Sequence, residues 1–313
     1  MLSRTADNLF WMSRYVERAE SIARILHAAS RMAAVPIAED TDSNEWQSAL
    51  AAAACDQAFA ATGQEATAEN VFEYLAFSED NPSSVRNCLR MARTNARAVR
   101  TALTTDTWEA INSAWLELHR YRTDDVSPSG LNRFIAWVKE TSLRVDGAAY
   151  RTMLRHDAYW FSRLGVYLER ADNTARILDV KYHVLLPPSV HVGGGLDFFQ
   201  WSTILRSVSA LTAYHWVYRD KLQPWLIADL LILREEMPRS LASCYANLTM
   251  FLDELARDYG RQGESQRHAR RICAQLRNAR TDDIFQGGLH EFLTEFITEN
   301  NRLGALIADQ YLI

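Results

Sequence analysis

YVERAESIARIL, residues 15–26, recurs at residues 167–178 as YLERADNTARIL. Eight of the twelve positions are identical, and the exchanges Val16 to Leu168 and Glu20 to Asp172 keep the chemical type. The identical residues include a Glu-Arg pair in the middle and an Arg-Ile-Leu run at the end. The chain therefore carries a second copy of a charged helical segment.

The match extends from this stretch towards the C-terminal end of each half. Similar residues recur in the same order, at offsets that grow from 152 at the Glu-Arg stretch to 158 near the end of each half. The matches are Trp46…Leu50 with Trp201…Leu205, Pro82…Ser84…Cys88 with Pro238…Ser240…Cys244, and Gly130-Leu131…Phe134 with Gly288-Leu289…Phe292. We therefore predict two tandem helical repeats, residues 1–146 and 147–313, that together form one continuous domain.

The hydrophobic periodicity is helical throughout. Glycine and proline are sparse, alternation typical of strands is missing, and segments rich in Ala, Leu, Arg and Glu repeat with a period near 3.6. The first half is expected to form helices at 3–34, 44–62, 69–77, 81–103, 106–121 and 127–145, and the second copy of the first helix at 148–186. The fold class is all-α, a helical bundle of two pseudo-symmetric repeats packed as one body.

The composition excludes several classes of protein. About 48% of the residues are hydrophobic and the net charge is −5, so bulk charge does not favour nucleic acid. Apolar runs are too short to span a bilayer, and the first residues show no apolar signal region. The four cysteines lack CxxC spacing and are typical of reduced thiols. We expect a cytoplasmic protein without membrane or nucleic-acid partners, which could form a homo-oligomer.

The repeated Glu-Arg stretch has three interpretations. Glu17, Glu20 and Arg24 share one helix face, as do Glu169, Asp172 and Arg176. They could form a solvated face of i,i+4 pairs. They could also form a buried network, in which Glu17 pairs with Arg170 and Glu169 with Arg18 across two facing helices. Alternatively, they could bind an anionic or amino-acid-like ligand.

Two other charged patterns are weaker candidates. Four carboxylates on two helices resemble part of a di-iron site, but the sequence has no Glu-x-x-His and the interleaved arginines repel a cation, so no metal is expected. A basic stripe with helical spacing consists of Arg86, Arg90, Arg93, Arg97 and Arg100. Such stripes are usually solvated, although this one could dock an acidic partner or a phosphate group.

The sequence 8–20, NLFWMSRYVERAE, resembles the signature of the bacterial alpha-E domain family, an all-helical family named for its Glu-Arg motif. Similar stretches occur at 81–85, at 95–100, at Trp108…Asn112 and at Asp197…Gln200-Trp201…Leu205, so the resemblance covers nearly the whole chain. One departure is Thr94, where the family pattern has an acidic residue.

The resemblance implies a role beside an enzyme. Such proteins are typically encoded next to, or fused to, a circularly permuted ATP-grasp ligase, often with a transglutaminase-like protein. This implies an accessory subunit in peptide or amide bond formation, with ATP and Mg²⁺ on the partner ligase and no cofactor on this chain. A small molecule or peptide would be the substrate.

Site roles follow from the Glu-Arg motif and its second copy. The motif carries over onto Glu17 and Arg18, and the internal repeat adds Glu169 and Arg170. Glu17 and Glu169 are the candidate catalytic groups, which would hold or deprotonate an attacking ammonium. The candidate substrate- or partner-binding residues are Arg14, Arg18, Glu20, Arg24, Arg170, Asp172, Arg176 and Arg97. Two alternatives stay open, a stand-alone enzyme using the same carboxylates and a purely structural scaffold.

Overall fold

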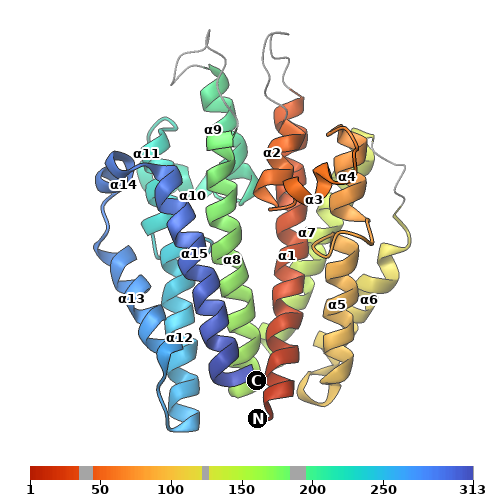
Figure 1. The fold of residues 1–313 in the computed structure, drawn as a ribbon, viewed down its shortest axis with the longest axis vertical. Helices are drawn as coiled ribbons and strands as arrows, with labels where there is room; N and C mark the ends of the chain where they lie inside the picture. The colour runs from red at the N-terminus through yellow and green to blue at the C-terminus, as the bar shows by residue number, and fades with distance from the viewer. Residues whose placement is uncertain (35–44, 122–126, 184–194, 313) are drawn as a thin grey trace.

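The computed structural model of this chain describes residues 1–34, 45–121, 127–183 and 195–312, which form helices and connecting turns without a strand (Figure 1). The helices up to residue 152 are α1 (Ser3–Ala33), α2 (Glu45–Ala52), α3 (Asp56–Ala60), α4 (Ala68–Ala76), α5 (Val85–Ala98), the short 3₁₀ helix η1 (Arg100–Ala102), α6 (Thr105–Leu118) and α7 (Pro128–Thr152). The predicted all-α fold class is confirmed.

The helices that follow are, in chain order, α8 (Asp157–His183), α9 (Gly195–Ser207), α10 (Leu211–Tyr218), α11 (Pro224–Ala228), the π-helix η2 (Asp229–Leu233), α12 (Leu241–Tyr259), α13 (Glu264–Asn278), α14 (Thr281–Gly287), α15 (Leu289–Ile307) and the π-helix η3 (Ala308–Leu312). None of the helices in the described ranges is long and apolar enough to cross a membrane.

The two longest helices, α1 and α8, lie side by side in the centre of the molecule (Figure 1). α5 and α7 pack against α1, whereas α12 and α15 pack against α8. The central pair approaches closely at Gly165, where an added Cβ would lie 2.2 Å from the carbonyl oxygen of Phe10. A side chain there would force the helices apart, so glycine sets the spacing across which the charged residues meet.

The hydrophobic core surrounds α1. Leu9 and Phe10 belong to a large cluster that also contains buried side chains of α8, α12 and α15. Leu26 belongs to a second cluster with side chains of α4, α5 and α7. Because α1 is covered on several sides, Glu17, Glu20 and Arg24 are buried, so the solvated-face interpretation is wrong for Glu17 and Glu20.

Several predicted helix boundaries are wrong. The single helix expected at 44–62 is two helices, because Ala54 adopts a left-handed conformation (φ 53°) between α2 and α3. α7 continues to Thr152, and the chain turns at 153–156 before α8, so the predicted boundary at 146/147 falls inside a helix. The predicted end near 186 lies outside the described residues.

Matching serine caps begin α5 and α12. The Ser84 hydroxyl accepts from the backbone N–H of Asn87 (3.2 Å) and donates to the carbonyl of Ser78. The Ser240 hydroxyl accepts from the N–H of Ser243 (2.9 Å) and likewise donates to a carbonyl six residues earlier. Such caps satisfy backbone groups that the first helical turn leaves free. They also fix the preceding residue, Ser83 or Arg239, beside the central helices.

Candidate functional site: a closed network and an open pocket between α1 and α8

Two reciprocal ion pairs join the central helices. Arg170 donates from Nε and Nη2 to the two carboxylate oxygens of Glu17, both at 2.9 Å. Arg18 donates in the same way to Glu169, at 2.6 and 3.1 Å. Glu17 and Glu169 are each only 3% exposed, so both fork-shaped contacts are buried. The predicted cross-helix pairs are confirmed, although pairing alone does not distinguish a structural network from a ligand site.

The first pair belongs to what we call the closed network, which consists of Glu17, Glu20, Arg24, Ser142, Arg170 and Arg239. Arg239, just before α12, bridges the two acids: Nη1 lies 3.0 Å from Oε1 of Glu17 and Nη2 lies 2.6 Å from Oε1 of Glu20. Arg24 donates to the same Glu20 oxygen from Nε and Nη2, at 2.9 and 2.6 Å. The Ser142 hydroxyl donates to the other oxygen.

The closed network leaves its acids fully engaged. Burial opposes ionisation of the Glu17 carboxyl, but the guanidinium groups of Arg170 and Arg239 lower its pKa to about 2. Arg24 also donates to the backbone carbonyl of Ser207, at the end of α9. A carboxylate with such a low pKa is a poor general base at neutral pH. The closed network therefore resembles a structural connection among α1, α8, α9 and the start of α12.

The second pair lines what we call the open pocket, a cavity of about 210 Å³ between α1 and α8. Arg14 adds a third donor to Glu169, from Nε at 2.8 Å, and Arg176 donates from Nε to Oδ2 of Asp172 at 2.6 Å. The polar and charged residues that line this cavity are Arg14, Arg18, Ser21, Ser83, Glu169, Asp172, Asn173, Arg176 and Asn301. Six of these nine belong to the Glu-Arg stretches, and a seventh, Arg14, adjoins one.

Three buried polar atoms of the open pocket have no hydrogen-bond partner among the residues that the structure describes: Oγ of Ser21, Oδ1 of Asp172 and Nδ2 of Asn173. Ser21 and Asn173 are only 3% and 7% exposed. A buried polar atom without a partner costs about 1–3 kcal/mol. Burial also raises the pKa of Asp172 in spite of the adjacent Arg176. Unlike the closed network, this pocket therefore has donors and an acceptor that a ligand could bind.

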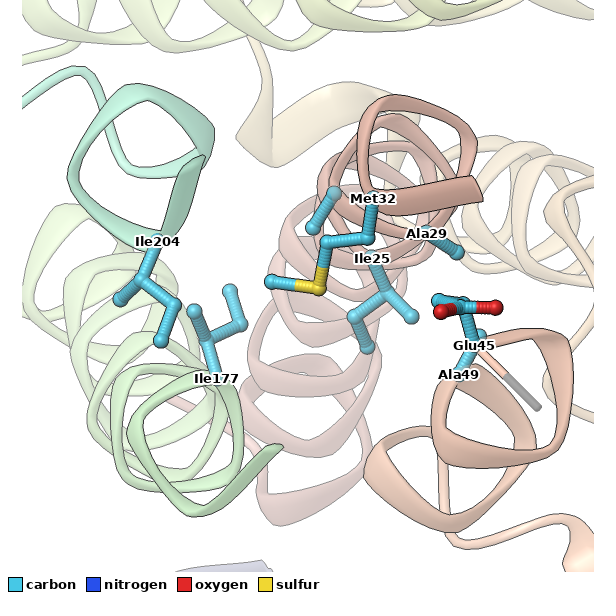
Figure 2. A pocket seen from close by; sticks show the side chains of 8 residues that line it. Ile25, Ala29, Met32, Glu45, Ala49, Ile177 and Ile204 are labelled. Carbon is cyan, nitrogen blue, oxygen red and sulfur yellow. The ribbon is translucent and has the colours of Figure 1, made fainter. Parts of the chain in front are cut away.

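A second, apolar pocket adjoins the open one at Ile25, which lines both. Figure 2 shows Ile25 and Met32 of α1 facing Ile177 of α8 and Ile204 of α9. The space is about 10 Å³, and Glu45 is the only charged residue among the described residues that line it. Of these two adjoining pockets, the open pocket is therefore the one suited to a polar ligand.

Other chemistry is poorly supported by the described residues. Burial raises the pKa of the Cys88 and Cys244 thiols to about 12, which makes them weak nucleophiles. Burial opposes ionisation of Glu169 as well, but Arg18 and Arg14 lower its pKa. Within the described ranges, no group of three or more His, Cys, Asp or Glu is arranged to hold a metal ion. The geometry thus favours binding over catalysis at Glu17 and Glu169.

Arg97 does not join the candidate site. It is exposed on α5, and among the described residues it forms no hydrogen bond or ion pair with the Glu-Arg cluster. Other members of its stripe have local partners: Arg86 pairs with Glu79, Arg93 donates to Asn112 and Arg100 stacks on Trp108. These contacts suit a solvated helix face.

Sequence reasoning missed several site residues. Arg239 and Ser83 are the central residues of the matching segments Pro238-Arg239-Ser240 and Pro82-Ser83-Ser84. The sequence could have pointed to them, because this is the one position at which the two segments differ. Ser21 and Asn173 likewise occupy equivalent, non-identical positions of the repeated stretch. Ser142 gave no signal, because a single serine in a helix pattern carries no information about a distant glutamate.

Comparison with known proteins identifies a family rather than an activity. The family model Alpha-E, described as a predicted alpha-helical domain with a conserved ER motif, matches residues 1–312. Two uncharacterized proteins, from Mycobacterium bovis and Mycobacterium tuberculosis, are each 23% identical over 318 aligned positions. The alignment covers 94% of this chain but 35% of each relative, so the chain spans about a third of their length. No solved structure matches significantly.

Proposed function

The chain belongs to the Alpha-E family, and on that premise we propose that it is the accessory, substrate-binding subunit of an ATP-grasp type amide ligase. The observation that carries the binding role is the open pocket, with its three unpartnered buried polar atoms. ATP and Mg²⁺ would bind to the ligase, which the family resemblance implies as partner. The greater length of the mycobacterial relatives fits a domain that works together with other domains.

Within this proposal the two charged regions have different roles. The closed network holds α1, α8 and the start of α12 in register, because its carboxylates are saturated by arginine donors. The open pocket receives the substrate. Glu169 then acts as a positioning residue that aligns Arg14 and Arg18 for the ligand, rather than as a catalytic base.

We also infer that the two halves are copies of one helical unit that meet at 153–156, the turn between α7 and α8. The identical residues of the two Glu-Arg stretches, the reciprocal pairs Glu17–Arg170 and Glu169–Arg18, and the matching serine caps support this duplication. The two copies then differ at Arg239, which donates to Glu17 and Glu20, whereas the first copy has Ser83 at the equivalent position.

Affinity purification of the tagged chain, followed by mass spectrometry, tests the partner. We expect an ATP-grasp ligase to co-purify, and ATP-dependent amide formation by that ligase to require this chain. Replacing Asp172 by Asn should lower turnover without releasing the ligase. Thr249→Val on α12 is the control, because it removes an unpartnered polar atom that lies outside the pocket. Ligase turnover that is indifferent to this chain would contradict the proposal.

The two rival functions predict other outcomes. A stand-alone enzyme would turn over a peptide without ATP or ligase, and Asp172 would be its best base because one of its carboxylate oxygens accepts no hydrogen bond from the described residues. A scaffold would co-purify with the ligase, yet Asp172→Asn would leave turnover unchanged. Turnover measurements on the wild-type chain and Asp172→Asn, each with and without the ligase, therefore distinguish the three functions.

A further inference from the structure

The open pocket lacks the residue that fills the closed network. In the closed network, Arg239 reaches from the start of α12 to Glu17 and Glu20. At the start of α5 the equivalent position is Ser83, which lines the pocket without a hydrogen bond to Glu169 or Asp172. Among the described residues, Oδ1 of Asp172 has no donor, whereas the second oxygen of Glu20 accepts from Ser142.

The pocket also holds unused donors. Arg14 and Arg176 bind their acids through Nε, and their Nη groups make no hydrogen bond to any residue that the structure describes. The amide nitrogen of Asn173 is a further buried donor without an acceptor. Three arginines face two carboxylates in this cavity, which leaves an excess of one positive charge. An anionic group would satisfy these donors and balance the charge.

An anion alone would leave Asp172 unsatisfied. Its free Oδ1 needs a donor, and a protonated amine supplies one together with a compensating charge. A ligand with a carboxylate next to an ammonium group meets both requirements. The volume of 210 Å³ is far above the roughly 10–15 Å³ that a single water molecule needs on the same measure, which leaves room for a small amino acid.

We propose that the open pocket binds a free α-amino acid, with its carboxylate held by Arg14, Arg176 and the amide of Asn173 and its ammonium group held by Oδ1 of Asp172. This assignment rests on the proposed substrate-binding role and specifies the substrate class. The amino acid would be the amine component of the amide bond that the partner ligase forms.

Isothermal titration calorimetry on the purified chain tests the ligand class, with L-alanine, propionate, L-alaninamide and inorganic phosphate as probes at up to about 10 mM. We expect L-alanine to bind, and propionate and L-alaninamide to bind at least about tenfold more weakly, since each lacks one charged group. Equal binding of propionate, phosphate and L-alanine would reduce the pocket to a general anion site and overturn the proposal. Failure of L-alanine to bind would overturn it as well.

Variants tie the binding to this pocket. Asn173→Ala removes an amide without a partner, so we expect an unchanged melting temperature but at least about tenfold weaker L-alanine binding. Thr249→Val should change neither quantity. Equal losses in both variants would place the ligand elsewhere. The ligase pull-down is independent of these titrations, so a ligase that co-purifies with a chain that ignores L-alanine refutes the ligand class alone.

Discussion

The closed network and the open pocket contain nearly the same residue types. Only in the closed network does every carboxylate oxygen of the two acids accept a hydrogen bond from the described residues. Each has a glutamate bound by the fork of an arginine across the α1–α8 interface, and a second acid paired with an arginine one turn later. In the closed network Arg239 donates to both acids and Ser142 donates to the second one, whereas in the open pocket the serine at the position of Arg239 lines a cavity. These additional donors distinguish the closed network from the open pocket.

The two regions also differ in the free-energy cost of burying their charged and polar groups. A buried ion pair contributes little net stability unless its hydrogen bonds are complete, because desolvation offsets the attraction between the charges. The closed network completes them with Ser142 and with backbone of α9. The open pocket leaves three atoms unsatisfied, which is unfavourable in the free protein and becomes favourable when a ligand pairs with them.

The largest effect is expected from removing the charge of Glu17. Glu17→Gln leaves Arg170 and Arg239 buried with one counter-charge fewer, which should lower the free energy of unfolding by about 3–5 kcal/mol. Glu169→Gln should cost clearly less, because Arg14 and Arg18 border a cavity and are 15% and 24% exposed. Urea denaturation of both variants measures the difference. An equal or larger loss for Glu169→Gln would refute the division into a closed and an open region.

The second-largest effect is expected from low pH, which should weaken the closed network. The pKa of Glu17 is about 2 in the folded chain, compared with 4.5 for an ordinary glutamate, so the unfolded chain binds more protons between these values. Stability should therefore fall as the pH drops from about 4.5 to about 2, by about 3 kcal/mol from this residue. Urea midpoints at pH 3 and pH 7 measure the loss, which should be smaller in Glu17→Gln.

Asp172 provides a control, because its contribution to the pH dependence of stability has the opposite sign to that of Glu17. Because burial raises its pKa, the folded chain holds that proton more tightly than the unfolded chain, and ionisation above its usual pKa of 3.8 reduces stability. Asp172→Asn should remove this part of the pH dependence and leave the acid loss of Glu17 in place. The acid loss should therefore be steeper in Asp172→Asn than in the wild type, and a shallower acid loss would contradict the pKa directions of the two regions.

Periodicity was sufficient to predict the fold class, but not the turns. The interval without glycine or proline before Pro36 predicts the extent of α1 within one residue at its C-terminal end. The turn at Ala54 and the continuation of α7 past residue 146 have no such markers, since an alanine in a left-handed conformation and a helix through Gly147 are decided by tertiary packing.

The site was predictable where the chain repeats itself. Identity between the copies singled out Glu17, Arg18, Glu169 and Arg170, and the structure pairs them as expected. The open pocket depends on differences between the copies, which a search for matching residues discards. Arg97 shows the opposite error, because helical spacing among arginines does not reveal which neighbours face them.

Removing Arg239 should open the closed network. Arg239→Ser takes away the donors to Glu17 and Glu20, but each acid retains another arginine, so we expect a loss of about 2 kcal/mol, less than for Glu17→Gln. The resulting cavity should resemble the open pocket. Urea denaturation measures the loss, and titration with L-alanine measures whether a second, weaker site appears. A loss as large as that of Glu17→Gln would mean that the bridge, rather than the cross-helix pair, holds this region together.

The converse substitution, Ser83→Arg, should close the open pocket with the smallest effect on stability. An arginine at this position lies at the equivalent of Arg239 and can donate to the free oxygen of Asp172. The hydrogen bond gained should raise the free energy of unfolding by about 1 kcal/mol, because it satisfies a buried acceptor. The same side chain would occupy the space of the ammonium group, so L-alanine binding should fall by at least about tenfold. Ser83→Ala, which adds no donor, should change neither stability nor binding appreciably. If Ser83→Arg instead left L-alanine affinity intact, the ammonium group could not lie against Asp172, and the difference between the two regions would have no functional consequence.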